Sequence, residues 1–354
     1  MTPEAMRMTP QQRGALCGLL AAALFGMSAP VAKRLLAHAG PLFLAGLLYA
    51  GAGAGLLAYR RLRPATEEAG LHRADLPKLA AVTLFGGVLG PVLMLLGLER
   101  VTAVSASLLL NLEAPFTILV AVLFFGDHLG RRAASAAFLI VGGASLLTLQ
   151  PGEAGADALG VLCLAAACLC WALDNNLTQR LTLRDPVAIV LAKTLGAGIS
   201  NLILALCLER DIPPVGVAGA ALLLGCLSYG ASVVLDVYAL RLVGAAREAA
   251  YFATAPFVGA FAAILVVGER LRWLDFVAMI AMAAGVTVLL RERHGHEHRH
   301  EEMVHEHVHV HDDHHRHTHG PDDPTGEPHS HPHRHEALVH DHPHVPDVHH
   351  RHRH

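Results

Sequence analysis

An internal repeat constrains this chain more than any other feature of its sequence. The second half contains Ala-Pro-Phe at 255–257, an apolar run, Gly-Glu at 268–269 and a second apolar run. The first half has the same order of parts, with Ala-Pro-Phe at 114–116 and Gly-Asp at 126–127. Such self-similarity between two halves indicates a duplicated structural unit. We therefore expect two copies of one fold within the chain.

Composition places most of the chain in a lipid bilayer. Hydrophobic residues make up 53% of the sequence and charged residues only 16%, and the mean hydropathy is +0.43. These values are too apolar for an ordinary soluble domain. The segment 291–354 differs, because it holds 23 of the 26 histidines, and its acidic residues outnumber its arginines. The sequence therefore predicts an apolar membrane domain followed by a polar tail.

Ten apolar runs are long enough to cross the bilayer, whose hydrocarbon core of ~30 Å needs about 20 helical residues. They lie at 14–34, 41–59, 78–98, 102–125, 133–149, 159–179, 186–208, 217–240, 245–267 and 273–290. The predicted fold is thus an all-α membrane protein with ten transmembrane helices, five in each half. The predicted divisions are an N-terminus (1–13), a first repeat (14–149), a linker (150–158), a second repeat (159–290) and a disordered tail (291–354).

The distribution of Lys and Arg predicts the orientation of these helices. If the N-terminus is cytoplasmic, the cytoplasmic loops carry 13 Lys and Arg and the opposite loops carry six. The positive-inside rule then places both chain ends in the cytoplasm. With an odd number of helices in each repeat, the second copy enters the membrane the other way up. Inverted repeats of this kind enclose a site near the middle of the membrane.

At these residues the chain resembles the EamA-like members of the drug/metabolite transporter superfamily. The resemblance rests on the five-plus-five layout and on the repeated Ala-Pro-Phe and Gly-acid element, and it covers about residues 14–290. Glu269 follows Pro256 by the family's usual 13 residues, whereas Asp127 follows Pro115 by one residue fewer. The resemblance implies a bacterial inner-membrane transporter of small solutes, often an exporter coupled to an ion gradient. The family's substrates include amino acids, metabolites, drugs and nucleotide sugars.

Glu113 is the most deeply placed ionisable residue of the predicted membrane domain. Ionisable groups at membrane depth are costly, and they mark functional sites. Glu113 lies near the middle of the fourth run, just before Pro115, which frees the backbone carbonyl of Asn111. Interrupted backbone of this kind lines transporter cavities. We expect Glu113 to act in a central cavity as a proton acceptor or a cation ligand.

Asp174 and Lys193 lie in the sixth and seventh runs, near the same predicted face of the membrane, where they could pair. Such a pair could contribute to the substrate path, or it could only join two helices. Asn175 and Asn176 follow Asp174 directly. Their amides could contact substrate or form hydrogen bonds between helices, and the sequence favours neither role.

Asp236 shares one predicted helix face with Tyr229 and Ser232, at spacings of seven and four residues. This polar stripe is a second candidate part of the substrate path, although Asp236 could also lie at the membrane interface. Glu269 and Asp127 fall in predicted loops, where each is expected to cap the helix that follows it.

The tail is predicted to bind divalent transition metals. Neutral imidazole is the commonest protein ligand for Zn²⁺, Ni²⁺, Co²⁺ and Cu²⁺, and alternating histidines offer many low-specificity sites. The remaining interpretation is a solvated extension that binds metal only incidentally. The candidate ligands are His294, His296, His298, His300, His305, His307, His309, His311, His314, His315, His317 and His319.

These observations predict a secondary active transporter, with proton-coupled export of a small metabolite as the first hypothesis. The alternatives are a Zn, Ni or Co exporter whose tail collects ions, and a membrane-anchored metal buffer that transports nothing. No enzyme motif occurs, no cofactor is required, and the acidic tail does not favour nucleic acid. The expected partners are the bilayer and a small molecule or ion, and a homodimer is one option for assembly.

Overall fold

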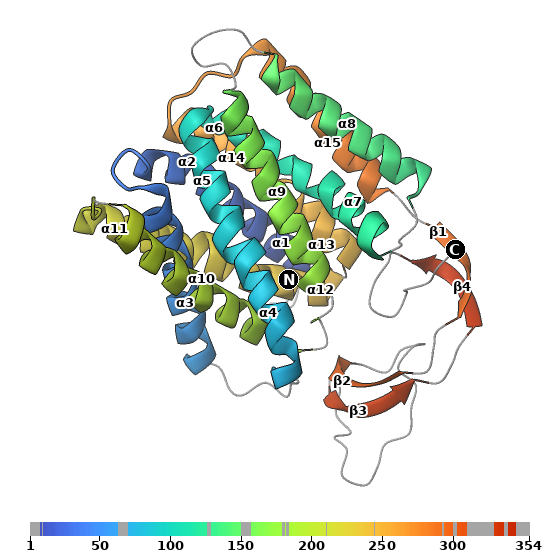
Figure 1. The fold of residues 1–354 in the computed structure, drawn as a ribbon. Coiled ribbons are helices and arrows are strands. Elements are labelled where there is room, and N and C mark those ends of the chain that lie inside the picture. Colours follow the sequence, from blue (N-terminus) through green and yellow to red (C-terminus); the bar gives the residue numbers. More distant parts are fainter. Residues whose placement is uncertain are drawn as a thin grey trace, which may run out of the picture.

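A computed structural model gives the fold of the chain (Figure 1). It describes residues 8, 10–62, 70–125, 129–149, 157–178, 181, 184–209, 211–243, 245–291, 294–299, 303–309, 329–335 and 339–344. Up to residue 291 the described chain consists of helices joined by short connections.

The first half contains a series of helices, several of them interrupted. They are α1 (Pro10–Gly26), α2 (Ser28–Leu35), α3 (Pro41–Leu62), η2 (Arg73–Asp75), α4 (Leu76–Val82), η3 (Thr83–Leu89), α5 (Gly90–Arg100), α6 (Ala103–Leu109), η4 (Leu110–Leu112), α7 (Glu113–Phe125) and α8 (Arg131–Thr148). Local sequence sets their starts. The Thr102 hydroxyl accepts a hydrogen bond of 3.1 Å from the backbone N–H of Ser105, and this caps α6.

The second half follows the same plan. Its helices are α9 (Ala158–Thr178), α10 (Pro186–Leu208), α11 (Val215–Gly225), η6 (Cys226–Ala231), α12 (Ser232–Val243), α13 (Ala245–Phe252), α14 (Ala255–Val266) and α15 (Trp273–Leu290). α10 begins with proline, and the Asp185 carboxylate before it accepts a hydrogen bond of 2.9 Å from the N–H of Val187. Both features are typical of helix N-termini.

Eight helical stretches of the described chain are long and apolar enough to cross a membrane, so the protein is an integral membrane protein. They are Gln11–Leu35, Pro41–Leu62, Arg73–Arg100, Ala103–Phe124, Ala158–Thr178, Val187–Leu208, Val215–Ala239 and Trp273–Leu290. The two other predicted runs correspond to α8 and to α13 with α14. Neither passes the same test of length and apolarity, and α14 is apolar but has only 12 residues. The predicted count of ten spans is therefore not confirmed.

The helices pack in pairs that join the two halves. α3 packs along α10, α8 along α15, and α6 against α14, and each pair joins corresponding positions of the two halves. The pair of α8 and α15 forms one edge of the bundle in Figure 1. Two further pairs cross over, because α1 packs on α12 and α5 on α9. In each of these two pairs, the first span of one half packs on the third span of the other half. The contacts are therefore symmetric between the two halves.

Glycine allows α3 to approach the other half closely. A Cβ atom added at Gly51 would collide with the backbone of Leu222 in α11, and one at Gly225 would collide with the backbone of Leu48 in α3. Gly51 and Gly225 therefore serve close helix packing. Backbone contacts of this kind replace the hydrophobic driving force that is weak between helices in lipid.

Two π-helical segments occupy matching positions in the two halves. η3 precedes α5 in the first half, and η6 precedes α12 in the second. A π-helical turn accommodates an extra residue and disturbs the regular hydrogen-bond ladder, and such turns occur often at functional sites. The sequence indicates only that glycines at these places allow bending.

The tail contains four short described strands. They are β1 (His294–Arg299), β2 (Met303–His309), β3 (His329–His335) and β4 (Val339–His344), and β1 pairs antiparallel with β4 and β2 with β3. The prediction of a disordered tail is not tested by these strands and stays a prediction. Histidine alternates with other residues there, and a two-residue period matches a strand. The rest of the tail lies outside the described residues.

Candidate functional site

Glu113 is the first residue of α7, at a break in a membrane-crossing stretch. The chain passes from α6 through the single turn η4 into α7, just before Pro115, whose ring cannot continue the backbone ladder. Near the break, the carbonyl groups of Leu109 and Leu110 accept contacts of 3.6 and 3.8 Å from Sγ of Cys168. The interruption expected from the sequence is present.

The Glu113 side chain meets α9. Its carboxylate accepts a hydrogen bond of 2.6 Å from Nδ2 of Asn175. Asn175 is exposed and Glu113 is half-buried, so this contact is not sealed inside the bundle. A carboxylate at membrane depth with an amide donor and access to its surroundings can take up and release a proton.

Asp174 and Lys193 form an ion pair between α9 and α10, as the sequence suggested they could. The exposed fraction of the side chain is 5% for Asp174 and 19% for Lys193. Asp174 also accepts a hydrogen bond of 3.1 Å from the hydroxyl of Thr178. The Glu113 carboxylate interacts electrostatically with both members of the pair. We call Glu113, Asp174, Asn175 and Lys193 the central cluster.

The π-helical segment η3 packs directly on the central cluster. A Cβ atom added at Gly86 would collide with the Asp174 carboxylate and would lie 2.8 Å from Nζ of Lys193. The carbonyl of Gly86 accepts two hydrogen bonds, of 2.7 Å from the hydroxyl of Tyr49 and of 3.2 Å from Nε1 of Trp171. Nothing in the sequence singles out Tyr49, because an aromatic residue within an apolar run is usually a core residue.

Aromatic rings from both halves of the chain pack against one another beside the central cluster. The ring centroids of Tyr49 and Tyr229 are 5.5 Å apart, and those of Phe25 and Tyr229 are 5.7 Å apart. Phe25 also contacts Phe252, with centroids 5.3 Å apart. Tyr229 is buried and is hydrogen-bonded to Ser28. Of the predicted polar stripe, Tyr229 is therefore the residue that packs toward the central cluster.

Three other predicted polar residues serve helix packing. The buried Asn111 amide donates to the carbonyl of Leu108 at 3.0 Å and contacts Sδ of Met282 at 3.8 Å. The Ser232 hydroxyl donates to the carbonyl of Ala21 in α1, at 2.9 Å. The remaining amide, of Asn176, donates to the carbonyls of Thr117 and Ala172. None of these three side chains is hydrogen-bonded to the central cluster in the described structure.

Asp236 has a partner that the sequence did not suggest. Its carboxyl group is hydrogen-bonded to that of Glu248, which lies in α13. Two carboxyl groups can share a hydrogen bond only if one of them is protonated. The other oxygen of Asp236, Oδ1, is buried and has no hydrogen-bond partner. The pair therefore holds at least one proton in this arrangement.

Glu269 corrects another expectation. It does not cap α15, the helix that follows it; the N-terminus of α15 is instead closed by Asp275, which accepts from the N–H of Arg272 at 2.9 Å. The Glu269 carboxylate accepts hydrogen bonds from the N–H groups of Ala103 and Val104 at the start of α6. The matching acid of the first half, Asp127, lies outside the described residues.

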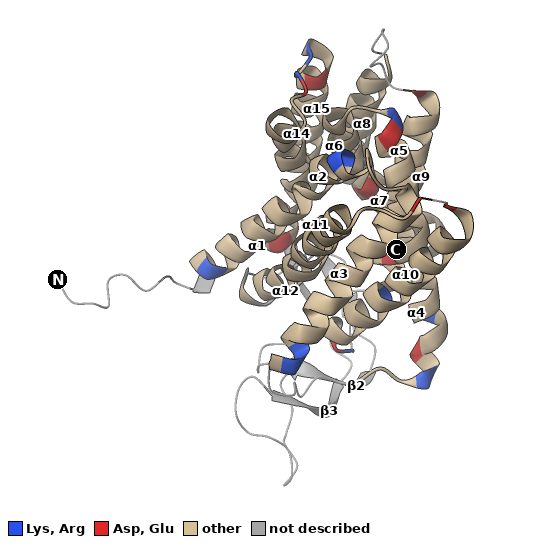
Figure 2. Ribbon diagram, turned by 90° about the vertical axis from the view of Figure 1, so that its left-hand side faces the viewer, with Lys and Arg blue, Asp and Glu red and all other residues tan. Residues whose placement is uncertain are grey.

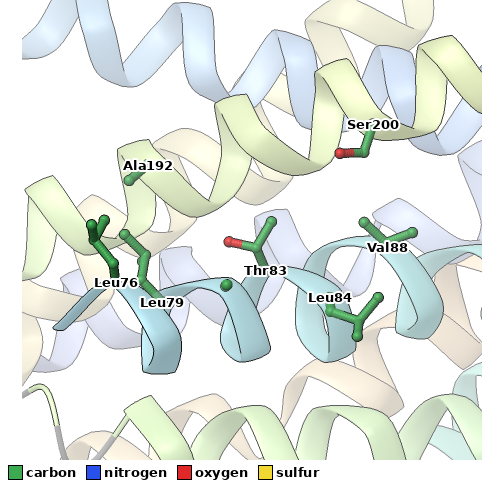
Figure 3. A pocket seen from close by; sticks show the side chains of 8 residues that line it. Leu76, Leu79, Thr83, Leu84, Val88, Ala192 and Ser200 are labelled. Carbon is green, nitrogen blue, oxygen red and sulfur yellow. The ribbon is translucent and has the colours of Figure 1, made fainter. Parts of the chain in front are cut away.

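The structure also has a groove between η3 with α4 and the neighbouring helix α10 (Figure 3). Its volume is about 370 Å³. It is lined by Leu76, Leu79, Ala80, Thr83, Leu84, Val88, Ala192 and Ser200. Since most of these side chains are apolar, the groove is chemically unlike the central cluster. In Figure 2 most blue segments lie near helix ends, whereas red segments also occur within the bundle.

The predicted metal ligands are only partly described. His294, His296 and His298 lie in β1, and His305, His307 and His309 lie in β2. His300, His311, His314, His315, His317 and His319 lie outside the described residues. Within the described ranges, no three His, Cys, Asp or Glu residues gather where they could hold a metal ion.

Comparison with known proteins identifies the family. The profile of the EamA-like transporter family matches residues 12–149 and 158–291. An uncharacterized transporter of Methanothermobacter thermautotrophicus is 30% identical over 289 residues, which cover 77% of this chain and 84% of the relative. A solved crystal structure shares the fold, with a TM-score of 0.58 and 18% identity over 78% of this chain and 97% of the other. The chain therefore belongs to the EamA-like transporter family.

Proposed function

We propose that this protein exports a small metabolite from a bacterial cell across the inner membrane and couples export to proton entry. The observation that carries the proposal is the central cluster. It brings a carboxylate, an amide and an ion pair together at an interrupted helix and a π-helical segment. Ionisable groups in such places mark substrate and proton paths.

In this proposal Glu113 exchanges one proton in each transport cycle. In its charged form the carboxylate accepts the hydrogen bond from Asn175 and interacts with the charge of Lys193. Protonation removes one negative charge from the central cluster. This change in charge shifts the equilibrium between the conformations that open to the two sides of the membrane. Asp236 and Glu248, which share a proton between α12 and α13, provide a second proton-binding pair.

The surroundings of the central cluster suit a small polar solute. Lys193 and Glu113 offer opposite charges, and Asn175 offers an amide. The rings of Tyr49 and Tyr229 supply an apolar wall next to these polar groups. Pockets for small molecules commonly combine aromatic walls with a few fixed polar groups. A divalent metal suits the cluster less well, because the Lys193 ammonium would repel it.

The tail has a separate role in this proposal. With both chain ends cytoplasmic, as the positive-inside rule predicts, its histidines bind transition metals on the cytoplasmic side. The competing hypothesis, metal export with the tail as collector, predicts that cells lacking the gene become metal-sensitive and are rescued only by the full chain. Rescue by both the full chain and residues 1–290 would separate the tail from transport.

Metabolite profiling tests the export proposal and identifies the substrate in the same experiment. Cells that produce the wild-type protein should accumulate at least one metabolite in the medium, and cells that produce Glu113→Gln should not. Asp157→Asn is the matched control, because Asp157 is an exposed acid paired with Arg100 at a helix end. Equal profiles for wild type and Glu113→Gln would refute the role of Glu113.

A further inference from the structure

Three charged side chains bind helix ends at one end of the bundle. The first is Glu209, which directly follows α10. Its two carboxylate oxygens accept hydrogen bonds of 2.8 and 2.9 Å from the N–H groups of Leu42 and Phe43, in the first turn of α3. Gly40 leaves room for this contact, since a Cβ atom there would collide with the Glu209 carboxyl group.

The second is Glu269, in the connection between α14 and α15. Its oxygens accept hydrogen bonds of 2.7 and 2.8 Å from the N–H groups of Ala103 and Val104, in the first turn of α6. The preceding residue, Gly268, has a φ of 80°, a left-handed conformation that glycine adopts without strain. The first turn of a helix has unpaired N–H groups and a partial positive charge, so a carboxylate binds well there.

The third is Lys33, near the end of α2. Its ammonium group donates hydrogen bonds to the carbonyl groups of Leu98, Glu99 and Val101, at the end of α5. It also interacts electrostatically with Glu269. The short turn between α5 and α6 is therefore held on one side by a cation and on the other by an anion.

Both glutamate contacts cross from the second half of the chain to the first. Glu209 lies 167 residues from Leu42, and Glu269 lies 166 residues from Ala103. Their helices meet at the same end, since α2 packs against α5, α6 and α11. We call this the clamped end, defined by Glu209, Glu269 and their four N–H partners.

The central cluster lies toward the opposite end. Asp174 and Asn175 are near the end of α9, which starts next to Arg100 at the clamped end and runs away from it. At the opposite end the halves are joined by a contact between side chains, in which Nε of Arg184 donates to Asp75 at 2.8 Å. Asn175 is exposed at this end of α9.

We propose that Glu209 and Glu269 form a gate that keeps the transporter closed at the clamped end and must release α3 and α6 before the cluster can open there. If the two halves separate at this end during transport, they must break these four hydrogen bonds. The inference rests on the proposed function only in assuming that the halves move relative to each other. It does not depend on the identity of the substrate or of the coupling ion.

Accessibility of a reporter cysteine tests the gate. Asn175→Cys is introduced into a chain whose six native cysteines are replaced by serine, and a membrane-impermeant maleimide is applied to right-side-out and to inside-out vesicles. With both glutamates intact, labelling should occur almost only from the side away from the clamped end. Glu209→Gln with Glu269→Gln should raise labelling from the clamped side by on the order of tenfold or more, because charge-assisted hydrogen bonds are lost.

Glu99→Gln is the matched control, because Glu99 is an exposed acid at the same end of the bundle. It should label like the parent protein. If the double variant labels like Glu99→Gln, the gate does not exist.

A cross-link provides a second arm that does not rely on weakened contacts. Ala103→Cys and Glu269→Cys are added to the reporter chain and joined with a bifunctional maleimide applied from the clamped side, before the impermeant maleimide is added. The cross-linked protein should be labelled less from the clamped side than the same chain before cross-linking. Undiminished labelling from that side after confirmed cross-linking would overturn the proposal.

The two proposals fail in different ways. Labelling requires neither protons nor substrate. Increased labelling of the double variant, together with wild-type export by Glu113→Gln, would support the gate and refute the proton-carrying role of Glu113. Loss of export in Glu113→Gln together with unchanged labelling in the double variant would do the reverse.

Discussion

Glu113 and Asn175 lie 62 residues apart in the sequence, and a hydrogen bond of 2.6 Å joins their side chains. The contact connects the break between α6 and α7 to the last turn of α9. It therefore links Glu113, the proposed proton carrier, to α9, the helix that carries Asp174 of the ion pair. Each part of this arrangement can be tested separately.

Asn175 and the adjacent Asn176 provide a matched pair of variants. Asn175→Ala should reduce export with little change in melting temperature, because Asn175 is exposed and its amide serves Glu113. Asn176→Ala should lower stability by about 1–3 kcal/mol, because its buried amide joins two backbone carbonyls. Export assays and thermal unfolding in detergent measure the two effects. If Asn176→Ala abolished export without loss of stability, the assignment of roles would be reversed.

Gly86 should not tolerate a side chain. Gly86→Ala would place a methyl group against the Asp174 carboxylate and 2.8 Å from Nζ of Lys193, so we expect a loss of about 1–3 kcal/mol in stability. Gly142→Ala in α8 is the control. A Cβ atom there would meet nothing within 4 Å, so this variant should be neutral or up to about 1 kcal/mol more stable. Equal melting temperatures for the two variants would contradict the close packing of η3 on the cluster.

The ion pair of Asp174 with Lys193 should show strong coupling in a double-mutant cycle. Removing one partner leaves the other as an unpaired charge in a buried site, which costs about 3–5 kcal/mol. Asp174→Asn and Lys193→Met should therefore each lower the melting temperature, and the double variant should recover much of the loss. Additive losses would show that the two side chains do not interact.

The tail should bind several Zn²⁺ or Ni²⁺ ions, with affinity that depends on pH. A protonated imidazole cannot coordinate a metal, so binding should be strong above about pH 7 and should fall as the pH drops through the ordinary histidine pKa of about 6.5. Isothermal titration of the full chain measures this. A chain whose tail histidines are all replaced by glutamine should lose the binding, and retention of it would place the metal elsewhere.

The sequence predicted the helical membrane domain because apolar length is a local property that a short window of residues reveals. It also identified Asp174 and Lys193 as residues that could pair, since both lie near the same end of neighbouring runs. It could not predict that Glu269 binds the start of α6, because that contact depends on how the two halves pack. Because Glu269 precedes α15 closely in the chain, the sequence suggested the start of α15 as its partner instead.

Two further residues of the site were missed for similar reasons. The Tyr49 hydroxyl donates to the Gly86 carbonyl, which the π-helical segment η3 leaves available as an acceptor. No sequence pattern predicts a π-helical turn of this kind. Glu248 lies beside an arginine near the start of a predicted run, where an acid is normally a surface residue. Its contact with Asp236 arises from the packing of α12 on α13.

The response of export to a proton gradient tests the central claim most directly. Proteoliposomes are loaded with the metabolite identified by profiling. Its release is measured with and without a pH gradient that is acidic outside, so that proton entry can drive export. Asp157→Asn is again the control, because the hydrogen bond from Arg100 lowers the pKa of Asp157 and keeps it charged. The gradient should accelerate release for the wild type and Asp157→Asn and leave Glu113→Gln unchanged. An equal acceleration of release by Glu113→Gln would contradict the account.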